Sequence, residues 1–525
     1  MYHTCSIDIH KKDELYPCLD RACSYACSMY NVANFYIRNL MTGLKKAPGM
    51  AMPNEVLVMD TVRQAVHEVN QKLQGRYETR AKDIMEDGSL AGQERLEKLS
   101  ALKYKPFEMP TAEKWFAGYR LLDAVFRHTD NPDYRAYHAH VMQNAVKDCC
   151  GAWASYFGAL KAYSSGGAGF TGRPRIPRYK KSGGRATAVF SNTACTIRGG
   201  DLLFPLERKE MPDGSIKKVR PSIRVSGLPR FGEKLVEVRA VPCYGSYRLQ
   251  LVTDDGIPEE GLIPGEDDIV RPGEGPAGVM TMDLGLDNFA AIADNRGGMP
   301  IVVKGGEIKA RNQWFNKRMA RLRSDLMRGH DPKRYRPAAT KQIQALSRKR
   351  DAFLRDTFYK YAHYICRLAV ERGISFIIAG HNEGQKQDIS LGRKANQAFV
   401  QVPLARFLCI LQATAFKYGI RVILQEESYT SKACFMERDP MPVYGQEGKE
   451  KPAFSGRRIK RGLYRQPDGR LINADINGSA NIGRKYDGRI FPEGQDYGYL
   501  CGTVKAMRYK GILEESHRYH RQGAS

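Results

Sequence analysis

Three sequence patterns are missing from this 525-residue chain. It has no run of about 18 apolar residues, so no membrane span is expected. Its first residues, MYHTCSIDIHKKDEL, lack the apolar core of a signal peptide, so we expect the protein to stay in the cytoplasm. Its 12 cysteines include no CxxC pair, which argues against a zinc ribbon and favours reduced thiols over a disulfide framework.

Acidic residues are scarce relative to basic ones. The chain has 57 Asp and Glu against 83 Lys and Arg, which gives a formal net charge of +26. Such a chain repels itself unless a polyanion neutralises part of it, and nucleic acid is the usual polyanion. The composition therefore favours a nucleic-acid-binding protein over a basic protein with a diffuse positive surface.

The patterns change along the chain, as expected for several domains. Residues 1–10 alternate as one strand, and helical patterns with little glycine extend over residues 15–160. A basic connector, SSGGAGFTGRPRIPRYKKSGGR, follows. The next segment has short β-like runs separated by Gly, Pro and Asp, which favour a small barrel. The rim of such a barrel suits oligonucleotides, although the same pattern is also typical of a scaffolding domain.

The second half of the chain begins after a Gly- and Pro-rich break at residues 272–276. AGVMTMD, FAAIA and PIVVKGG predict three strands in a meander. Two long helices, a strand (ISFIIAG), a helix over residues 397–418 and a strand (IRVILQEE) follow. This order is that of the RNase H fold. We therefore predict a multidomain α+β protein with an RNase H-like α/β domain in its second half.

Asp283 is the first candidate for chemistry. It ends the buried strand VMTMD, where a carboxylate faces a cleft, a turn or a metal rather than the core. Asp287, in the following GLDN, is better placed to cap the turn. Phosphodiester hydrolysis needs divalent ions held by carboxylates that converge from separate strands, so the question is which acids meet Asp283.

Asp475 is the second candidate. In LINADINGSANIGRK it opens a predicted helix, a position where an Asp is often only an N-cap. The small residues Gly478, Ser479 and Ala480 would let this helix pack closely on a sheet. That packing fits an acid held over the first strand.

Three glutamates are candidates for the third acid. The strand FIIAG ends in Gly380 without an acid at its tip, and Glu383 follows shortly after it. The next strand ends with Glu426 and Glu427, and its tip should lie beside the tip of FIIAG. Because consecutive residues of a strand face opposite ways, only one of these two glutamates can point at the site.

Six segments in order resemble the TnpB transposon-associated nucleases and the type V CRISPR effectors derived from them. They lie between residues 169 and 485 and read GFTGRPRIPRYKK, MDLGLDNFAAIAD, RDTFYKYAHYICRLAVERGISFIIAG, NQAFVQVPLARFLCILQATAFKYGIRV, EESYTSKACF and FSGRRIKRGLYRQPDGRLINADINGSANI. The resemblance implies a RuvC-like, Mg²⁺-dependent nuclease that carries a guide RNA. It would cut double-stranded DNA matched by the guide, beside a short adjacent motif. It would act in a prokaryotic cytoplasm, at the nucleoid.

The resemblance also implies roles for the three acids. Asp283 and Asp475 match the first and last catalytic acids of the family. In a subset of the family the middle glutamate has moved from the FIIAG strand to the next one, just before Tyr-Thr-Ser-Lys, and Glu427 occupies that place. The three would bind two Mg²⁺ ions, for which Mn²⁺ can substitute, and Glu383 and Glu426 are alternates for the glutamate.

Family members often carry two Cys pairs between the last two acids, whereas only Cys434 lies there in this chain. A structural zinc is therefore not expected. By the resemblance, the chain has a wedge-type β-barrel, a helical recognition lobe, a RuvC nuclease domain, a degenerate target-nucleic-acid-binding insert and a tail. The wedge domain would comprise residues 1–12 and 166–270, the recognition lobe residues 13–165, and the RuvC domain residues 271–433 and 471–487. The insert would comprise residues 434–470 and the tail residues 488–525.

Basic residues with interleaved tyrosines predict nucleic-acid contacts in the connector and in the insert. The candidates are Arg173, Arg175, Arg178, Tyr179 and Lys180 in the connector, and Arg457, Arg458, Lys460, Arg461 and Arg465 in the insert.

Two other functions stay open from the sequence. The missing acid after FIIAG favours an RNA-guided DNA-binding protein that does not cut. The RNase H-like connectivity also suits a transposase that acts on its own element ends without a guide. The sequence leaves open whether the guide comes from a transposon end or a CRISPR array, and also the adjacent motif, the cut pattern and the oligomeric state.

Overall fold

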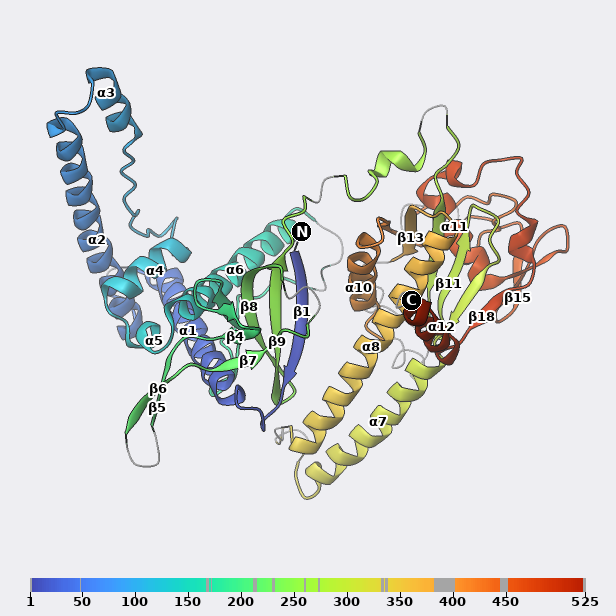
Figure 1. Cartoon of the computed structure of the whole chain (residues 1–525), viewed down its shortest axis with the longest axis horizontal. Coiled ribbons are helices and arrows are strands. Elements are labelled where there is room, and N and C mark those ends of the chain that lie inside the picture. The colour runs from blue at the N-terminus through green and yellow to red at the C-terminus, as the bar shows by residue number, and fades with distance from the viewer. Residues whose placement is uncertain are drawn as a thin grey trace. The chain divides into compact units, whose positions relative to one another are not determined.

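The computed structural model divides the chain into two compact units, Met1–Ile257 and Pro258–Ser525 (Figure 1). The residues that it describes are 2–47, 49–166, 170, 172–210, 215–228, 232–258, 261–271, 274–331, 335, 339–381, 402–443 and 452–522. Within these ranges, no helix is both long and apolar enough to cross a membrane. Each unit buries its own hydrophobic core.

The first unit packs helices beside a four-stranded antiparallel sheet. Its helices are α1 (Tyr16–Gly43), α2 (Pro53–Glu86), α3 (Gly92–Ala101), α4 (Tyr119–His128), α5 (Pro132–Arg135) and α6 (Ala139–Ser164). Its strands are β1 (Tyr2–Ile9), β2 (Ala188–Ser191), β3 (Thr196–Arg198), β4 (Asp201–Leu203), β5 (Glu207–Glu210), β6 (Ile216–Val219), β7 (Ser222–Arg224), β8 (Lys234–Cys243) and β9 (Ser246–Asp254).

The strand predicted over residues 1–10 is confirmed as β1. It pairs antiparallel with β9, from Tyr2 opposite Asp254 to Ile9 opposite Tyr247, in a sheet of order β1-β9-β8-β2. The remaining strands of the unit form the separate sheets β3-β4-β7 and β5-β6. The closed barrel therefore stays a prediction, as does the wedge domain.

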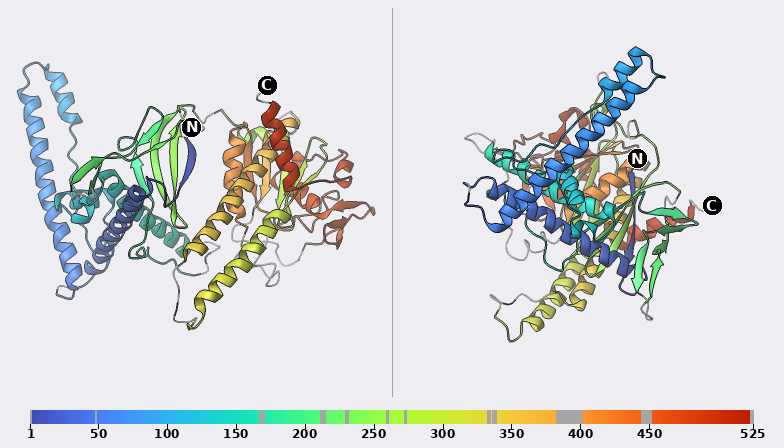
Figure 2. Two further views of the ribbon diagram at one scale, coloured as in Figure 1. Left: turned by 60° about the horizontal axis from the view of Figure 1, so that its bottom comes forward. Right: turned by 90° about the vertical axis from the view of Figure 1, so that its left-hand side faces the viewer.

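Most of residues 15–160 are helical as predicted, but residues 102–118 form no helix and the burial of the helices is uneven. α1 and α6 are buried along most of their length against the sheet and each other. In α2, the buried residues lie between Glu55 and Val66, and none is buried in α3. The later part of α2 and the returning α3 therefore extend away from the core of their unit (Figure 2).

The second unit is built on a six-stranded sheet of order β14-β13-β10-β11-β12-β18. Its strands are β10 (Val279–Leu284), β11 (Asn288–Asp294), β12 (Ile301–Lys304), β13 (Phe376–Gly380), β14 (Arg421–Gln425), β15 (Arg457–Lys460), β16 (Leu463–Arg465), β17 (Leu471–Asn473) and β18 (Lys505–Met507). Its helices are α7 (Gly306–Met327), α8 (Lys341–Glu371), α10 (Leu404–Phe416), α11 (Ala474–Tyr486) and α12 (Tyr509–Gln522), with short 3₁₀ turns η1 (Glu266–Ile269), η2 (Gly488–Ile490) and η3 (Gly498–Cys501).

The connectivity predicted for the second half is confirmed. β10, β11 and β12 form an antiparallel meander, and β13 and then β14 add in parallel on the other side of β10. The two long helices lie between β12 and β13, and α10 connects to β14. This arrangement is mixed α/β, as predicted, whereas its assignment as a RuvC domain stays a prediction.

Part of the range 488–525, which is predicted to be a separate tail, joins the same sheet. β18 pairs in parallel with β12, with Lys505 opposite Ile301. Leu500 and Ile512 are fully buried in the unit. A strand of three residues is too short to show an alternating pattern, which is why the sequence did not indicate it.

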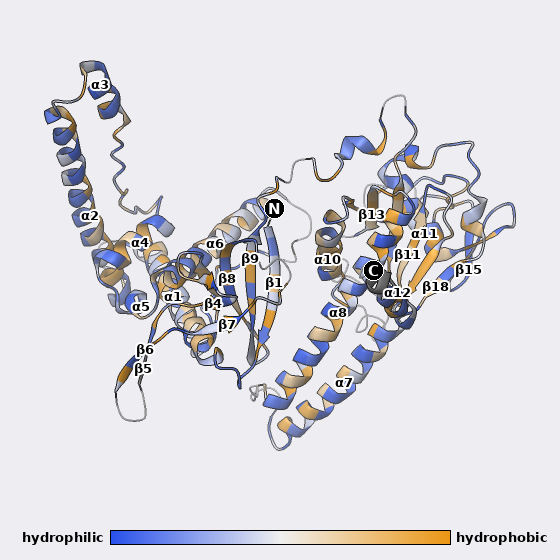
Figure 3. Cartoon of the chain, viewed as in Figure 1, coloured by the Kyte–Doolittle hydropathy of each residue, from blue (hydrophilic) through white to orange (hydrophobic). Residues whose placement is uncertain are grey.

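The six-stranded sheet carries helices on both faces (Figure 1). Met280 and Met282 of β10 pack in the cluster formed with α8 and α10. Val279 and Thr281 point to the opposite face, where the Thr281 and Ser479 hydroxyl oxygens lie 3.0 Å apart across to α11. Along α7 and α8, hydrophilic and hydrophobic residues alternate, because one side of each helix faces away from the core (Figure 3).

A buried ion pair holds the far end of β11. The Asp294 side chain is 0% exposed, and its Oδ2 accepts a hydrogen bond of 2.5 Å from Arg372. Its Oδ1 accepts from the backbone nitrogens of Arg296 (2.9 Å) and Gly298 (3.0 Å). Arg372 also donates to the carbonyl of Met299 at 2.9 Å. The pair fastens the β11–β12 turn to the end of α8.

We predict that Arg372→Met lowers the free energy of unfolding of the second unit by about 3 kcal/mol, because it leaves the Asp294 carboxylate buried without its cation. Urea unfolding of the full chain measures the change. The control is Arg328→Met, which removes an exposed pair with Asp325 and should cost less than about 0.5 kcal/mol. Equal effects of the two variants would contradict the prediction.

Candidate metal-binding carboxylate site

Asp283 lies near the end of β10, at the edge where the parallel strands β13 and β14 also end. It shares a face with Thr281, toward α11, because alternate residues of a strand point the same way. A Cβ built on Gly478 would lie only 2.9 Å from Asp283 Oδ2. The missing side chain therefore lets α11 cross closely over the carboxylate, and this confirms the close packing predicted for that helix.

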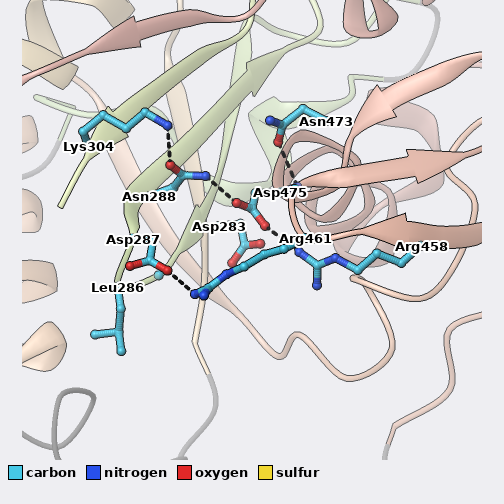
Figure 4. A pocket seen from close by; sticks show the side chains of 11 residues that line it. Asp283, Leu286, Asp287, Asn288, Lys304, Arg458, Arg461, Asn473 and Asp475 are labelled. Atoms are coloured by element: carbon cyan, nitrogen blue, oxygen red, sulfur yellow. Dashed lines mark hydrogen bonds and ion pairs between the residues drawn. The ribbon is translucent and has the colours of Figure 1, made fainter. Parts of the chain in front are cut away.

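Asp475 lies in the first turn of α11 but does not cap it. The N-cap is Asn473, whose Oδ1 accepts hydrogen bonds from the backbone nitrogens of Asp475 (3.0 Å) and Ile476 (3.2 Å). The Asp475 carboxylate points instead toward β11, where its Oδ2 accepts from Asn288 Nδ2 at 2.6 Å (Figure 4). The side chain is thus available for a role other than capping.

Glu427 brings a carboxylate to the tip of β13, where the sequence has no acid. β13 ends at Gly380, opposite Gln425 of β14, and Glu427 follows shortly after β14. A Cβ built on Gly380 would overlap Glu427 Oε2 and lie 2.6 Å from Ile482 Cδ1. Glu427 therefore occupies the space that a side chain on β13 would need.

Glu426 faces another partner. Its Oε2 lies 2.5 Å from Lys485 Nζ of α11, and its Oε1 accepts from the Ser428 backbone nitrogen at 2.6 Å. Burial raises the pKa of Glu426, but hydrogen bonds from Lys485 and Ser428 outweigh it and hold that pKa below its ordinary value. Glu426 is thus engaged in a salt bridge to α11. The other alternate, Glu383, lies outside the described residues.

Two asparagines of α11 fix the loop that follows Glu427. Asn477 Nδ2 donates to the carbonyl of Ala433 at 2.8 Å. Asn481 Nδ2 donates to the carbonyls of Thr430 (2.9 Å) and Ala433 (2.8 Å). Both asparagines are fully buried. This role is not predicted above, although two asparagines four apart on a helix that packs on a sheet are a signal for it.

A pocket of about 670 Å³ opens beside Asp283 and Asp475. Two arginines of the β15–β16 hairpin border it (Figure 4). Arg458 lies 3.2 Å from Asp475 Oδ1, and Arg461 pairs with Asp287. The lining residues are Asp283, Gly285, Leu286, Asp287, Asn288, Lys304, Arg458, Arg461, Gly462, Asn473 and Asp475.

Negative charge accumulates at Asp283. Burial raises the pKa of Asp283 well above its ordinary value, the charges of Glu427 and Asp475 raise it further, and Arg458 acts in the opposite direction. At Asp287, by contrast, a hydrogen bond from Lys309 comes first among the causes that lower the pKa. Three carboxylates that repel one another, each from a different element, are the donor set that a hard divalent cation such as Mg²⁺ prefers. By their chemistry the three carboxylates suit such an ion, although their ligand atoms do not all lie within 4.8 Å of one another in the structure.

Other potential metal ligands have different environments. His3, Glu233 and Asp255 in the first unit have ligand atoms within 4.8 Å of one another. Their atoms already bond within the protein, since His3 Nε2 lies 2.8 Å from Asp255 Oδ2 and Thr253 donates to Glu233 at 2.6 Å. Cys434 is buried, and burial raises the pKa of its thiol, which is the opposite of what a thiolate ligand needs.

The predicted nucleic-acid contacts fall in three places. Arg458 and Arg461 lie at the carboxylate pocket. Arg457, Lys460 and Arg465 are exposed on the small sheet β15-β16-β17, and Arg173, Arg175 and Arg178 are exposed on the first unit.

Tyr179 and Lys180 of the connector contact residues of α1. Asn31 exchanges two hydrogen bonds with the backbone of Lys180, of 3.0 and 2.7 Å. The Lys180 ammonium lies 4.1 Å from the centre of the Tyr30 ring, and the Arg38 guanidinium 4.7 Å from that of Tyr179. Tyr179 as a residue is 45% exposed, so it remains accessible to a partner.

Two known families match the second unit. Residues 265–385 match the OrfB_IS605 family, described as a probable transposase, and residues 405–482 match the Cas12f1-like TNB domain. Together the two matches support a TnpB-like family. The first match contains Asp283, and the second contains Glu427, Arg458 and Asp475 and extends beyond both ends of the predicted insert. Among curated proteins, none matches this chain.

Several solved structures are similar to this chain. A Cas12f1–sgRNA–target DNA complex is 11% identical over 91% of this chain and 98% of that chain, with a TM-score of 0.27. A CRISPR-Cas12f ternary complex is 14% identical over 81% and 80%, with a TM-score of 0.28. C2c1 of Alicyclobacillus acidoterrestris with single-guide RNA is 12% identical over 88% and 70%, with a TM-score of 0.30.

The raised pKa of Asp283 predicts how stability depends on pH without a divalent ion. A carboxyl group whose folded pKa is raised contributes stability that is fully present below the ordinary aspartate range, near pH 4, and is lost as the pH rises through the folded value. Asp283→Asn replaces the carboxyl group with an amide, which stays uncharged at every pH. In EDTA at pH 7.5 it should therefore melt at a higher temperature than the unchanged chain, and the gain should shrink toward pH 4.

The control for this prediction is Asp287→Asn in the same pocket. The pKa of Asp287 is lowered, so its ionised form contributes stability above about pH 4 and loses it at lower pH. This variant should melt slightly lower at pH 7.5. Thermal melts across pH measure both, and a loss of stability in Asp283→Asn at pH 7.5 would refute the prediction.

Proposed function

We propose that this chain is an RNA-guided DNA endonuclease of the RuvC type, which cuts guide-matched double-stranded DNA next to a short adjacent motif. The observation that carries the proposal is that the charges of Glu427, which follows β14, and of Asp475 in the first turn of α11 both act on the buried Asp283 of β10. The family matches, which support a TnpB-like nuclease family, favour this assignment. Its net charge of +26 supports nucleic-acid partners.

The three acids would hold two Mg²⁺ ions, with Mn²⁺ as a substitute. When bound, such ions activate a water and stabilise the leaving oxygen of a phosphodiester. The protein contributes the spacing: Gly478 leaves room over Asp283, and Gly380 leaves room for the Glu427 carboxylate. One site of this kind would cut the two DNA strands in turn.

The arginines of the β15–β16 hairpin would hold the DNA strand at the pocket. Arg458 pairs with Asp475, and Arg461 with Asp287, in the structure. Both side chains are substantially exposed, 45% and 85%, so a backbone phosphate can replace their carboxylate partners. A bound cation at Asp475 would favour this exchange, because it would neutralise the partner of Arg458.

Guide RNA would be held mainly by charge. The exposed arginines of the connector and the exposed Tyr179 are suited to phosphates and to a stacked base. In guided nucleases, base pairing reads the target sequence while the protein reads duplex shape and the adjacent motif. Sequencing of the RNA that co-purifies with the chain tests this part and also distinguishes a transposon-end guide from a CRISPR guide.

Two rival functions give different results in the same experiments. A binding protein without cleavage would shift guide-matched DNA in a gel and leave it intact at every Mg²⁺ or Mn²⁺ concentration. The position of Glu427 at the acid-free tip of β13 favours cleavage over this rival. A transposase, which the description of the first matched family favours, would purify without RNA and give strand-transfer products.

We predict that Glu427→Gln lowers the rate of guided cleavage by more than about 100-fold, the upper range for loss of an outer hydrogen-bond partner of a metal ligand. Binding of guide and target should be unchanged, because the variant keeps the shape of the side chain. Cleavage of labelled target in Mg²⁺ and a gel shift in EDTA measure the two properties.

The matched control is Glu426→Gln, the neighbouring glutamate that pairs with Lys485. The rate of guided cleavage in this variant should stay within about tenfold of the rate of the unchanged chain, because the change removes a salt bridge and not a metal ligand. Asp283→Ala removes a proposed metal ligand, so its cleavage rate serves as the inactive baseline. If Glu426→Gln abolished cleavage and Glu427→Gln did not, the assignment of the middle acid would be wrong. If Asp283→Ala kept full activity, the site itself would be wrong.

A further inference from the structure

A chain of two hydrogen bonds leads from β12 to the last candidate acid (Figure 4). Lys304 Nζ donates to Asn288 Oδ1 at 2.8 Å, and Asn288 Nδ2 donates to Asp475 Oδ2 at 2.6 Å. The first two residues lie directly opposite each other on β11 and β12. Both line the same pocket as Asp475.

A β-bulge turns Asn288 toward this pocket. Asn288 pairs with Lys304 and Ala290 with Val303, so Phe289 is an extra residue on β11. Phe289 and Ala290 accordingly both pack in the cluster with α8 and α10, although neighbouring strand residues normally face opposite sides. Without the bulge, Asn288 would share the face of Ala290 and point away from α11. The bulge reverses that direction.

The chemistry of Lys304 fixes which end of the amide meets Asp475. An ammonium group only donates hydrogen bonds, so it can pair only with the oxygen of Asn288. The nitrogen of the amide must then face Asp475, where it donates to Oδ2. The opposite oxygen of Asp475, Oδ1, faces Arg458 at 3.2 Å. The two carboxylate oxygens of Asp475 therefore have different partners, Asn288 for Oδ2 and Arg458 for Oδ1.

We propose that Asn288 and Lys304 are positioning residues that set the orientation in which Asp475 binds its divalent ion. The inference rests on the proposed function, in which Asp475 is a metal ligand. Asn288 suits this role because it is a neutral donor, which holds one oxygen without competing as a cation for the charge of the carboxylate. Lys304 acts one step further out and keeps the amide from turning over.

The test measures metal affinity on the protein alone. Mn²⁺ binding to the full chain, without guide or DNA, is followed by electron paramagnetic resonance in the unchanged chain and in Asn288→Leu and Lys304→Met. We expect affinity to fall by about 10- to 100-fold in Asn288→Leu, as for other lost partners of metal ligands. Lys304→Met should lose about tenfold, and Lys304→Arg, which still donates to Asn288, should lose less.

The sign of the Lys304 result separates positioning from simple electrostatics. Removal of a cation beside a metal site should strengthen Mn²⁺ binding if only charge matters. The matched control is Lys309→Met, which removes a cation from the same neighbourhood but bonds to Asp287 at 2.5 Å rather than to Asn288. It should leave Mn²⁺ affinity unchanged or slightly tighter. Affinities in Lys304→Met and Asn288→Leu equal to that of Lys309→Met would overturn the proposal.

Two further measurements keep the outcome clear. In guided cleavage, Asn288→Leu should raise the Mg²⁺ concentration for half-maximal rate while high Mg²⁺ recovers much of the rate, which a general loss of folding would not do. Asp475→Asn and Asp283→Asn should abolish tight Mn²⁺ binding. If they leave it unchanged, the proposed metal site fails. If they abolish it while Asn288→Leu and Lys304→Met do not weaken it, only the positioning role fails.

Discussion

The central constraint of the second unit is the negative charge that Glu427 and Asp475 bring close to the buried carboxyl group of Asp283. Burial and the neighbouring charges of Glu427 and Asp475 raise the pKa of Asp283, so the protein holds these groups together at a cost. Much of the surrounding structure serves that purpose. Gly380 and Gly478 leave space, Arg458 supplies a counter-charge, and buried asparagines of α11 fix the loop behind Glu427.

The strands that carry the site follow from the sequence because their patterns are long and apolar. VMTMD and FIIAG are buried runs bounded by Gly, and a parallel arrangement brings their carboxyl ends to one edge. Asp283 stands out because it is a charged residue at the end of such a run. Asp475 was ambiguous, because an acid at a helix start is usually a cap, and only the structure assigns the cap to Asn473.

Other features depend on contacts that no local pattern reveals. The bulge at Phe289 adds one residue without changing the apolar character of β11, so the direction of Asn288 is invisible in the sequence. β18 has only three residues and joins the sheet through pairing with β12. The choice between Glu426 and Glu427 depends on Lys485, which lies far away in sequence and close in space.

Under the proposed function, the middle acid comes from the segment after β14 and not from β13, so the site is defined by a point in space rather than by one strand. Two adjacent parallel strands end at the same edge, so either can deliver a carboxylate to the same point, provided that the other ends in glycine. A comparison made strand by strand would class such a chain as having lost its nuclease centre. A search for a glycine-ended strand beside one followed closely by a glutamate would recover it, and would separate relocated centres from truly vacant ones.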